Sequence, residues 1–154
     1  MHLSAFSAVA FILIPFPYDA LSSSVLGSGP EEAIKLFREA DAKCEYAPCR
    51  HPGRYAFGTS KGRTHVLYYT WDQARPLSLD SSQKFATNII PKDAQKIRTT
   101  LKQDGSIVEV FHSETLVKTF GTDPDVWIGA NPGTFVVFHS NRLRKTIISV
   151  GDYP

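Results

Sequence analysis

Residues 96–112 have the sequence KIRTTLKQDGSIVEVFH, in which two runs with β character flank an Asp104-Gly105 turn. Asp-Gly between two such runs is a strong hairpin signal, because tight hairpin turns need residues that tolerate positive φ. The second run, 106–112, predicts a strand. The first run also fits a helix, since Ala94, Ile97 and Leu101 recur at helical spacing. The segment therefore predicts a hairpin and leaves a helix open for its first half.

Two further hairpins are predicted on either side of this one. Residues 63–71 (RTHVLYYTW) are mostly β-branched or aromatic and contain no breaker, which is typical of a strand. Residues 55–59 can pair with them across the turn at 60–62. The chain ends in runs 134–140 (TFVVFHS) and 144–150 (RKTIISV), joined at 141–143. The pattern is one of antiparallel strands connected locally.

Helices are predicted before the first hairpin and between the hairpins. Pro30 suits the first position of a helix that runs to about residue 41, with apolar residues at helical spacing. Ser113 suits the N-cap of a helix over 113–120, and Gly121 its C-terminal stop. Residues 72–90 predict a loop with a short helix near 82–88. Hairpins with two helices and no βαβ rhythm predict an α+β fold, a small antiparallel β-sheet built from hairpins with two short helices packed on one face.

The N-terminal segment indicates export. The run from Ala5 to Phe16 is almost entirely apolar and about 12 residues long, shorter than the roughly 20 that span a bilayer and close to a signal-peptide core. Small residues allow cleavage after Ser22 or after Gly27. The stretch before the run carries only His2 in place of a Lys or Arg, so a buried strand or a retained anchor remains open. We expect a signal peptide over 1–27, a single domain over 28–154 without a transmembrane helix, and a secreted or periplasmic location.

The two cysteines, Cys44 and Cys49, agree with export. An even count with no leftover thiol favours a disulfide in an oxidising compartment. Zinc needs four ligands, and no second cysteine pair exists. A thioredoxin-type redox pair has two intervening residues, whereas this pair has four. We therefore expect a structural disulfide, and neither a metal nor a cofactor.

Three histidines fall in or near strands: His65, His112 and His139. A cluster of them could bind zinc or perform acid–base chemistry with Glu109. Alternation along the strand points Glu109 to the face opposite His112. The alternative is that the three histidines lie separately at the rims of the sheet.

The loop 122–133 is one candidate contact surface. It contains Asp123, Asp125 and Trp127 among four turn-forming residues, and long ordered loops often carry function. Trp127 could anchor a partner. We favour the other interpretation, in which Trp127 folds back to plug one end of the core.

A basic segment is the second candidate contact surface. Residues 42–75 hold six Lys or Arg against two acidic residues, with aromatic residues interspersed. Arg54, Lys61 and Arg63 are its candidate binding residues, for a polyanion or for another protein. A solvated loop is the alternative. The formal net charge of the chain, +2, is too small to indicate nucleic acid.

These observations favour a secreted or periplasmic binding or interaction module over an enzyme. The sequence has no serine elbow, phosphate loop, zinc-protease motif or paired-carboxylate signature. One alternative is a small secreted hydrolase acting on a phosphodiester, with Arg63 and one or more of the three histidines. Another is a structural component of the cell envelope.

Overall fold

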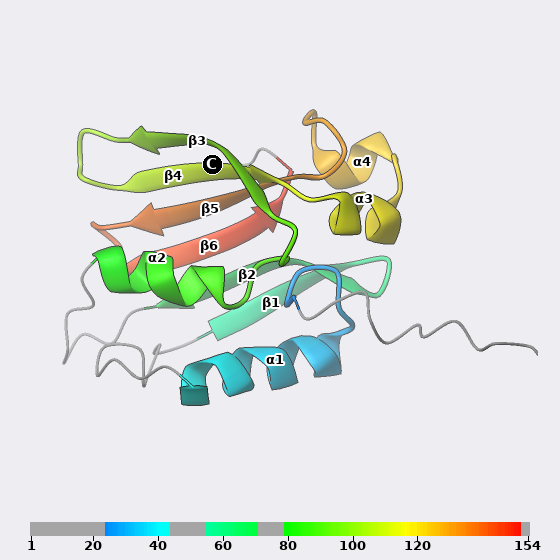
Figure 1. Ribbon diagram of the computed structural model, residues 1–154, viewed down its shortest axis with the longest axis horizontal. Coiled ribbons are helices and arrows are strands. Elements are labelled where there is room, and N and C mark those ends of the chain that lie inside the picture. The colour runs from blue at the N-terminus through cyan, green and yellow to red at the C-terminus, as the bar shows by residue number, and fades with distance from the viewer. Residues whose placement is uncertain (1–23, 44–54, 71–78, 152–154) are drawn as a thin grey trace, which may run out of the picture.

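The computed structural model describes residues 24–43, 55–70 and 79–151, which form a six-stranded sheet with four helices (Figure 1). The helices are α1 (Pro30–Lys43), α2 (Leu79–Thr87), α3 (Glu114–Phe120) and α4 (Pro124–Trp127). The strands are β1 (Tyr55–Ser60), β2 (Arg63–Thr70), β3 (Gln95–Leu101), β4 (Ile107–His112), β5 (Thr134–Ser140) and β6 (Lys145–Val150). The α+β fold predicted from the sequence is confirmed.

The sheet is antiparallel throughout and has the order β1-β2-β6-β5-β4-β3. All three predicted hairpins form. In the β1–β2 turn, Lys61 and Gly62 have φ of 52° and 73°, the positive pair that a two-residue turn requires. The last strand, β6, lies between β2 and β5 and so joins the β1–β2 hairpin to the rest of the sheet.

The strand β3 settles the ambiguity of residues 96–102. It is an edge strand whose residues are all exposed, and it pairs with β4 from Gln95↔His112 to Leu101↔Ile107. The register shifts between Lys96 and Arg98, so Ile97 forms an irregularity in the edge. Pairing with β4 therefore outweighs the helical spacing of its apolar residues.

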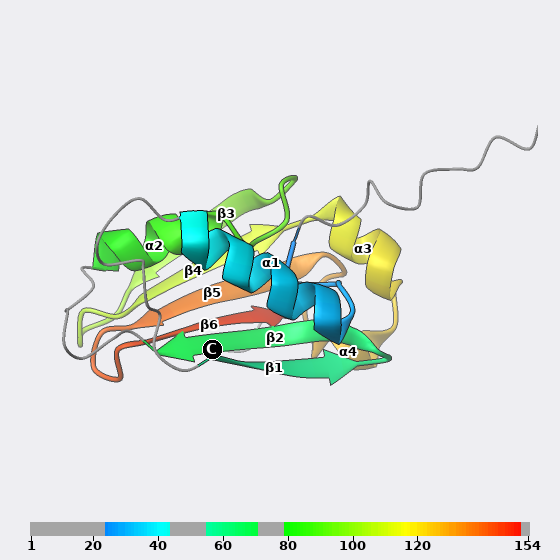
Figure 2. The same cartoon turned by 90° about the horizontal axis from the view of Figure 1, so that it is seen from below.

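The two longer helices cover one face of the sheet (Figure 2). Helix α1 packs near β2, and α2 packs over β5. Proline begins α1, and Ala33 and Phe37, one turn apart, are both buried. Helix α2 is the short helix that the sequence predicts within 72–90.

The two shorter helices lie together at one end of the sheet (Figure 1). Ser113 caps α3 as predicted, because its Oγ accepts a hydrogen bond of 3.2 Å from the Leu116 amide. Asp93 adds a second cap by accepting from the Thr115 amide at 2.9 Å. Gly121, with φ of 72°, ends the helix.

The core lies between α1, α2 and the sheet and continues to the end closed by α3 and α4. Its fully buried side chains come from helices α1, α3 and α4, from the sheet, and from the segments before α1 and after α2: Val25, Leu26, Phe37, Leu67, Tyr69, Ile89, Leu116, Trp127, Phe135, His139 and Ile148. A smaller apolar cluster on the opposite face of the sheet contains Val108, Val110 and Val136.

The segment just before α1 belongs to this core. Val25 and Leu26 are each 1% exposed, and Val25 donates a backbone hydrogen bond to Ile89 at 3.0 Å. Gly27 donates to Thr64 at 2.8 Å. The predicted boundary after residue 27 thus runs through a packed, hydrogen-bonded segment, whereas cleavage after Ser22 would leave that segment whole.

No helix in the described ranges combines the length and the apolar character needed to cross a membrane.

Candidate functional site

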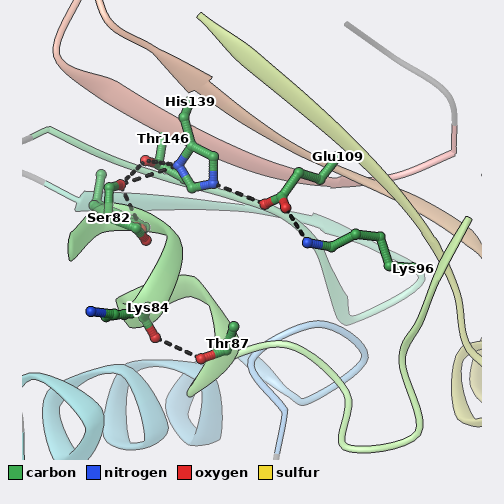
Figure 3. A network of polar contacts seen from close by, with 8 residues as sticks. Ser82, Lys84, Thr87, Lys96, Glu109, His139 and Thr146 are labelled. Carbon is green, nitrogen blue, oxygen red and sulfur yellow. Dashed lines mark hydrogen bonds and ion pairs between the residues drawn. The ribbon is translucent and has the colours of Figure 1, made fainter. Parts of the chain in front are cut away.

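A line of polar side chains crosses the covered face of the sheet. Tyr69 on β2 pairs with Thr146 on β6, which pairs with His139 on β5. Glu109 on β4 extends the line. It faces the same side of the sheet as Ile107, two residues earlier on the strand, and Ile107 pairs with His139. Ser82 reaches the line from α2. We call these five residues the buried polar cluster. Figure 3 labels Ser82, Glu109, His139 and Thr146.

Hydroxyl groups fill one end of the buried polar cluster. Ser82 Oγ lies 2.6 Å from Thr146 Oγ1 and 3.2 Å from His139 Nδ1. Thr146 Oγ1 lies 3.0 Å from the same nitrogen. Burial raises the pKa of Tyr69 to about 12, so its hydroxyl keeps its proton and donates to the Ser82 carbonyl at 3.3 Å.

A carboxylate ends the line on the other side. Glu109 Oε2 lies 3.4 Å from His139 Nε2, and Lys96 Nζ, from β3, donates to Glu109 Oε1 (Figure 3). Burial alone would raise the pKa of Glu109, but the neighbouring His139 imidazole and the hydrogen bond and charge of Lys96 hold it at about 2. The Glu109 side chain is 5% exposed and that of Lys96 is 50% exposed. A buried carboxylate is therefore ionised and is reached from solvent on the lysine side.

A cavity of about 240 Å³ opens beside this carboxylate, between α2 and strands β3 to β5. Its walls are mainly apolar and are formed by Ala86, Ile90, Phe111 and Val137. Glu109 and Lys96 line it together with three polar residues, Gln83, Lys84 and Thr87. Lys84 is paired with Asp80 at 2.9 Å. An apolar pocket with a few convergent polar groups is the usual form of a small-molecule site.

The His139 ring lies between Ser82 and Glu109. This is the arrangement of a serine–histidine–acid catalytic triad. A nucleophilic serine must reach a substrate. Ser82 is fully buried, and Thr146 lies within 2.6 Å of its oxygen. In this conformation the three residues form a structural network, and the group that faces the cavity is the Glu109 carboxylate.

The three candidate histidines are separated. His139 lies in the buried polar cluster, while His112 is hydrogen-bonded to Glu114 at 2.8 Å and is on the opposite face of β4 from Glu109. His65 lies on β2, four residues from Tyr69, at the other end of that strand. Within the described ranges, no group of three or more His, Cys, Asp or Glu is placed to hold a metal ion.

The two candidate contact surfaces meet at one ion pair. Lys61, in the β1–β2 turn, donates to Asp123 Oδ2, and Asp123 caps α4 by accepting from the Asp125 amide at 3.1 Å. This pairing lowers the pKa of Asp123. Arg63 is exposed and donates to the Gly27 carbonyl at 3.4 Å. Asp123 and Lys61 thus join the two loops.

Trp127 plugs the core, as the favoured interpretation predicts. It is fully buried, its ring packs edge-on against Phe120, and Nε1 donates to the Gly121 carbonyl at 3.0 Å. Arg54 and the predicted Cys44–Cys49 disulfide lie outside the described residues.

Comparison with known proteins gives no match, whether by family model, by curated sequence or by solved structure.

Sequence reasoning missed Ser82, Lys96 and Thr146 as partners of the site. One signal was available. Glu109 is a lone carboxylate in the apolar run IVEVFH and shares the inward face with Phe111, so its burial requires a partner.

Proposed function

We propose that this chain binds a small molecule with an apolar body and a positively charged end, in the cavity beside Glu109. The observation that carries the proposal is a single ionised carboxylate, 5% exposed, that lines a cavity with mainly apolar walls. Such a group fixes the orientation of a ligand whose remaining surface is apolar.

Lys96 is the group that a ligand would replace. It comes from an exposed edge strand, its side chain is half exposed, and its ammonium is bound to Glu109 Oε1. A ligand ammonium at that position makes the same charge-assisted hydrogen bond while its apolar body fills the space beside Phe111. The cavity of about 240 Å³ suits a molecule of one ring and a short chain.

His139 would hold the carboxylate in place during this exchange. His139 Nε2 lies 3.4 Å from Glu109 Oε2, while Nδ1 lies within hydrogen-bond distance of the hydroxyls of Ser82 and Thr146. The carboxylate therefore keeps one partner when Lys96 moves away.

The test uses three probes that share a body and differ at one end: phenethylamine, phenylacetate and phenethyl alcohol. We expect phenethylamine to bind best, with a Kd on the order of a millimolar given its few atoms, by NMR titration of the full chain. Glu109→Gln should weaken its binding about tenfold or more, because a charged hydrogen bond is lost. Lys96→Met should strengthen it by up to about fivefold, because the competing cation is removed.

Glu114→Gln is the matched control, since Glu114 also lies beside a histidine, His112, but does not line the cavity. It should leave binding unchanged. Preference for phenylacetate, or equal binding to wild type and Glu109→Gln, would contradict the proposal.

The hydrolase hypothesis has less support. It needs at least two histidines and Arg63 in one cleft. Only His65 shares strand β2 with Arg63. His139 lies in the buried polar cluster and His112 lies beside Glu114, so no two of the three histidines converge with the arginine in one cleft. The structural envelope role has no feature of its own in its favour.

We also propose that the protein is exported, with cleavage after Ser22. The apolar run from Ala5 to Phe16 supports export, and the packing of Val25 and Leu26 favours Ser22 over Gly27. Intact mass of protein from the culture medium or periplasm tests both points. Loss of 22 residues, with two thiols alkylated only after reduction, is the expected result, and a full-length cell-associated chain with free thiols would contradict it.

A further inference from the structure

Two neighbouring hairpin tips lie at the end of the sheet opposite α3 and α4 (Figures 1 and 2). The tips are the β3–β4 turn and the β5–β6 turn. They contact one another, because the Asn141 amide donates to Ser106 Oγ at 3.2 Å. We call residues 101–106 and 141–145 the tip patch.

Each tip exposes a leucine. Leu101 is 71% exposed and Leu143 is 61% exposed, which makes them the two most exposed large apolar side chains described. Water-exposed leucines at the ends of hairpins contribute nothing to the core. Two exposed leucines on hairpins that contact one another are candidates for an interaction surface.

Positive charge surrounds both leucines. Arg142 and Arg144 flank Leu143, Lys145 follows, and Lys102 adjoins Leu101. Asp104 is the one carboxylate in the tip patch, which therefore has a net charge of +3. The partner that complements this patch is negatively charged and accepts apolar side chains.

We propose that the tip patch docks on an anionic lipid surface. Leu143 lies in the β5–β6 turn and Leu101 ends β3, so both are exposed at the ends of hairpins. A fluid interface can surround such side chains, whereas a rigid partner would need a matching hollow. Insertion of the leucines, with arginine and lysine at headgroup depth, combines the two terms that drive interfacial binding.

Nucleic acid fits less well. The aromatic rings nearest the tips, Tyr68 and Phe138, have lysine ammoniums over them, Lys145 at 4.3 Å and Lys102 at 5.1 Å from the ring centroids. Stacking of bases on aromatic rings requires their open faces. A second copy of the chain would bring like charges together.

The experiment measures sedimentation of the full chain with phosphatidylcholine vesicles, with and without phosphatidylserine. The uncharged run from Ala5 to Phe16 contributes equally to both, so the readout is the difference in affinity between them. We expect anionic vesicles to bind at least tenfold tighter, because each surface cation contributes about fivefold. Added salt should reduce this preference.

Two pairs of variants test the residues. Arg142→Gln/Arg144→Gln should remove most of the preference, whereas Lys35→Gln/Lys118→Gln, which removes two exposed lysines elsewhere, should keep more of it. Leu143→Ser should weaken binding to anionic vesicles several-fold. Ile128→Ser, at a residue 56% exposed at the opposite end of the sheet, should not.

The proposal would be overturned if wild type showed no preference for anionic vesicles. It would also be overturned if a tip-patch variant and its control lost the same amount of binding or of preference. So would tighter binding to single-stranded DNA or to heparin than to the vesicles, since the patch would then be a site for a soluble polyanion. The pocket beside Glu109 plays no part in these measurements.

Discussion

His139 Nε2 lies 3.4 Å from Glu109 Oε2, with the histidine side chain fully buried and the glutamate 5% exposed. The contact joins β5 to β4 beneath α2, and on its solvent side Glu109 also holds Lys96. A buried carboxylate with two basic partners ties the stability of the fold to pH.

Acid should destabilise the protein through Glu109. Its pKa in the folded chain is about 2, below the ordinary 4.5, so the ionised form stabilises the fold above pH 4.5. That contribution, roughly 2–3 kcal/mol, should disappear as the pH falls from about 4.5 to about 2. Urea unfolding of wild type and Glu109→Gln at pH 7 and pH 3 measures it. The variant should lose less stability on acidification, and Glu114→Gln should behave as wild type.

Removal of the Ser82 hydroxyl should cost about 1–3 kcal/mol of unfolding free energy. Its oxygen lies within hydrogen-bond distance of Thr146 and His139, and buried polar groups without partners are destabilising. Chemical denaturation of Ser82→Ala gives the value. Thr87→Ala on the same helix removes an exposed hydroxyl and should change stability by less than about 0.5 kcal/mol. Equal effects would show that the Ser82 hydroxyl is not held in the cluster.

Leu26→Ala should destabilise the fold by about 2–4 kcal/mol, because the side chain is 1% exposed in the core. Leu143→Ala, at an exposed turn, should change stability by less than about 0.5 kcal/mol. Thermal unfolding of both variants compares them. A Leu26→Ala protein as stable as Leu143→Ala would place the start of the packed domain after residue 26.

Alanine substitutions at two glycine positions can distinguish destabilisation by a steric clash from destabilisation by backbone strain. Gly151 and Gly129 have φ of 88° and 78°, so alanine is strained at both, by roughly 1–2 kcal/mol. A Cβ at Gly151 would lie 2.6 Å from the Trp127 carbonyl oxygen, whereas Gly129 has open space. Gly151→Ala should therefore be clearly more destabilising than Gly129→Ala in urea unfolding. Equal losses would show that the backbone near Trp127 yields to the added methyl group.

The hairpins could be predicted from the sequence because each depends on a few adjacent residues. Each turn is indicated by its own residues: Ser60–Gly62, Asp104-Gly105 and the residues after Ser140. The runs beside these turns alternate in hydrophobicity or carry β-branched residues. The strand order could not be predicted in this way. The place of β6 beside β2 depends on contacts between residues about 80 positions apart in the chain, such as Tyr68 and Ile147.

The candidate site was predicted only in part, for the same reason. The sequence suggests acid–base contact between Glu109 and one of three histidines, and the alternation of side chains along the strand argues against His112 as that partner. The choice of His139 as partner depends on the pairing of β4 with β5, in which Ile107 lies opposite His139. Ser82 enters from a helix that the local pattern of residues 72–90 hardly indicates.

The position of β6 has a consequence for how the protein is made. Synthesis releases Lys145–Val150 after all the other described strands, yet these residues form the seam between the β1–β2 hairpin and β5. A nascent chain that lacks them has two separate pieces of sheet, each with an open edge where the seam belongs. The sheet can therefore be completed only after β6 has left the ribosome, although every other described strand is synthesised before it.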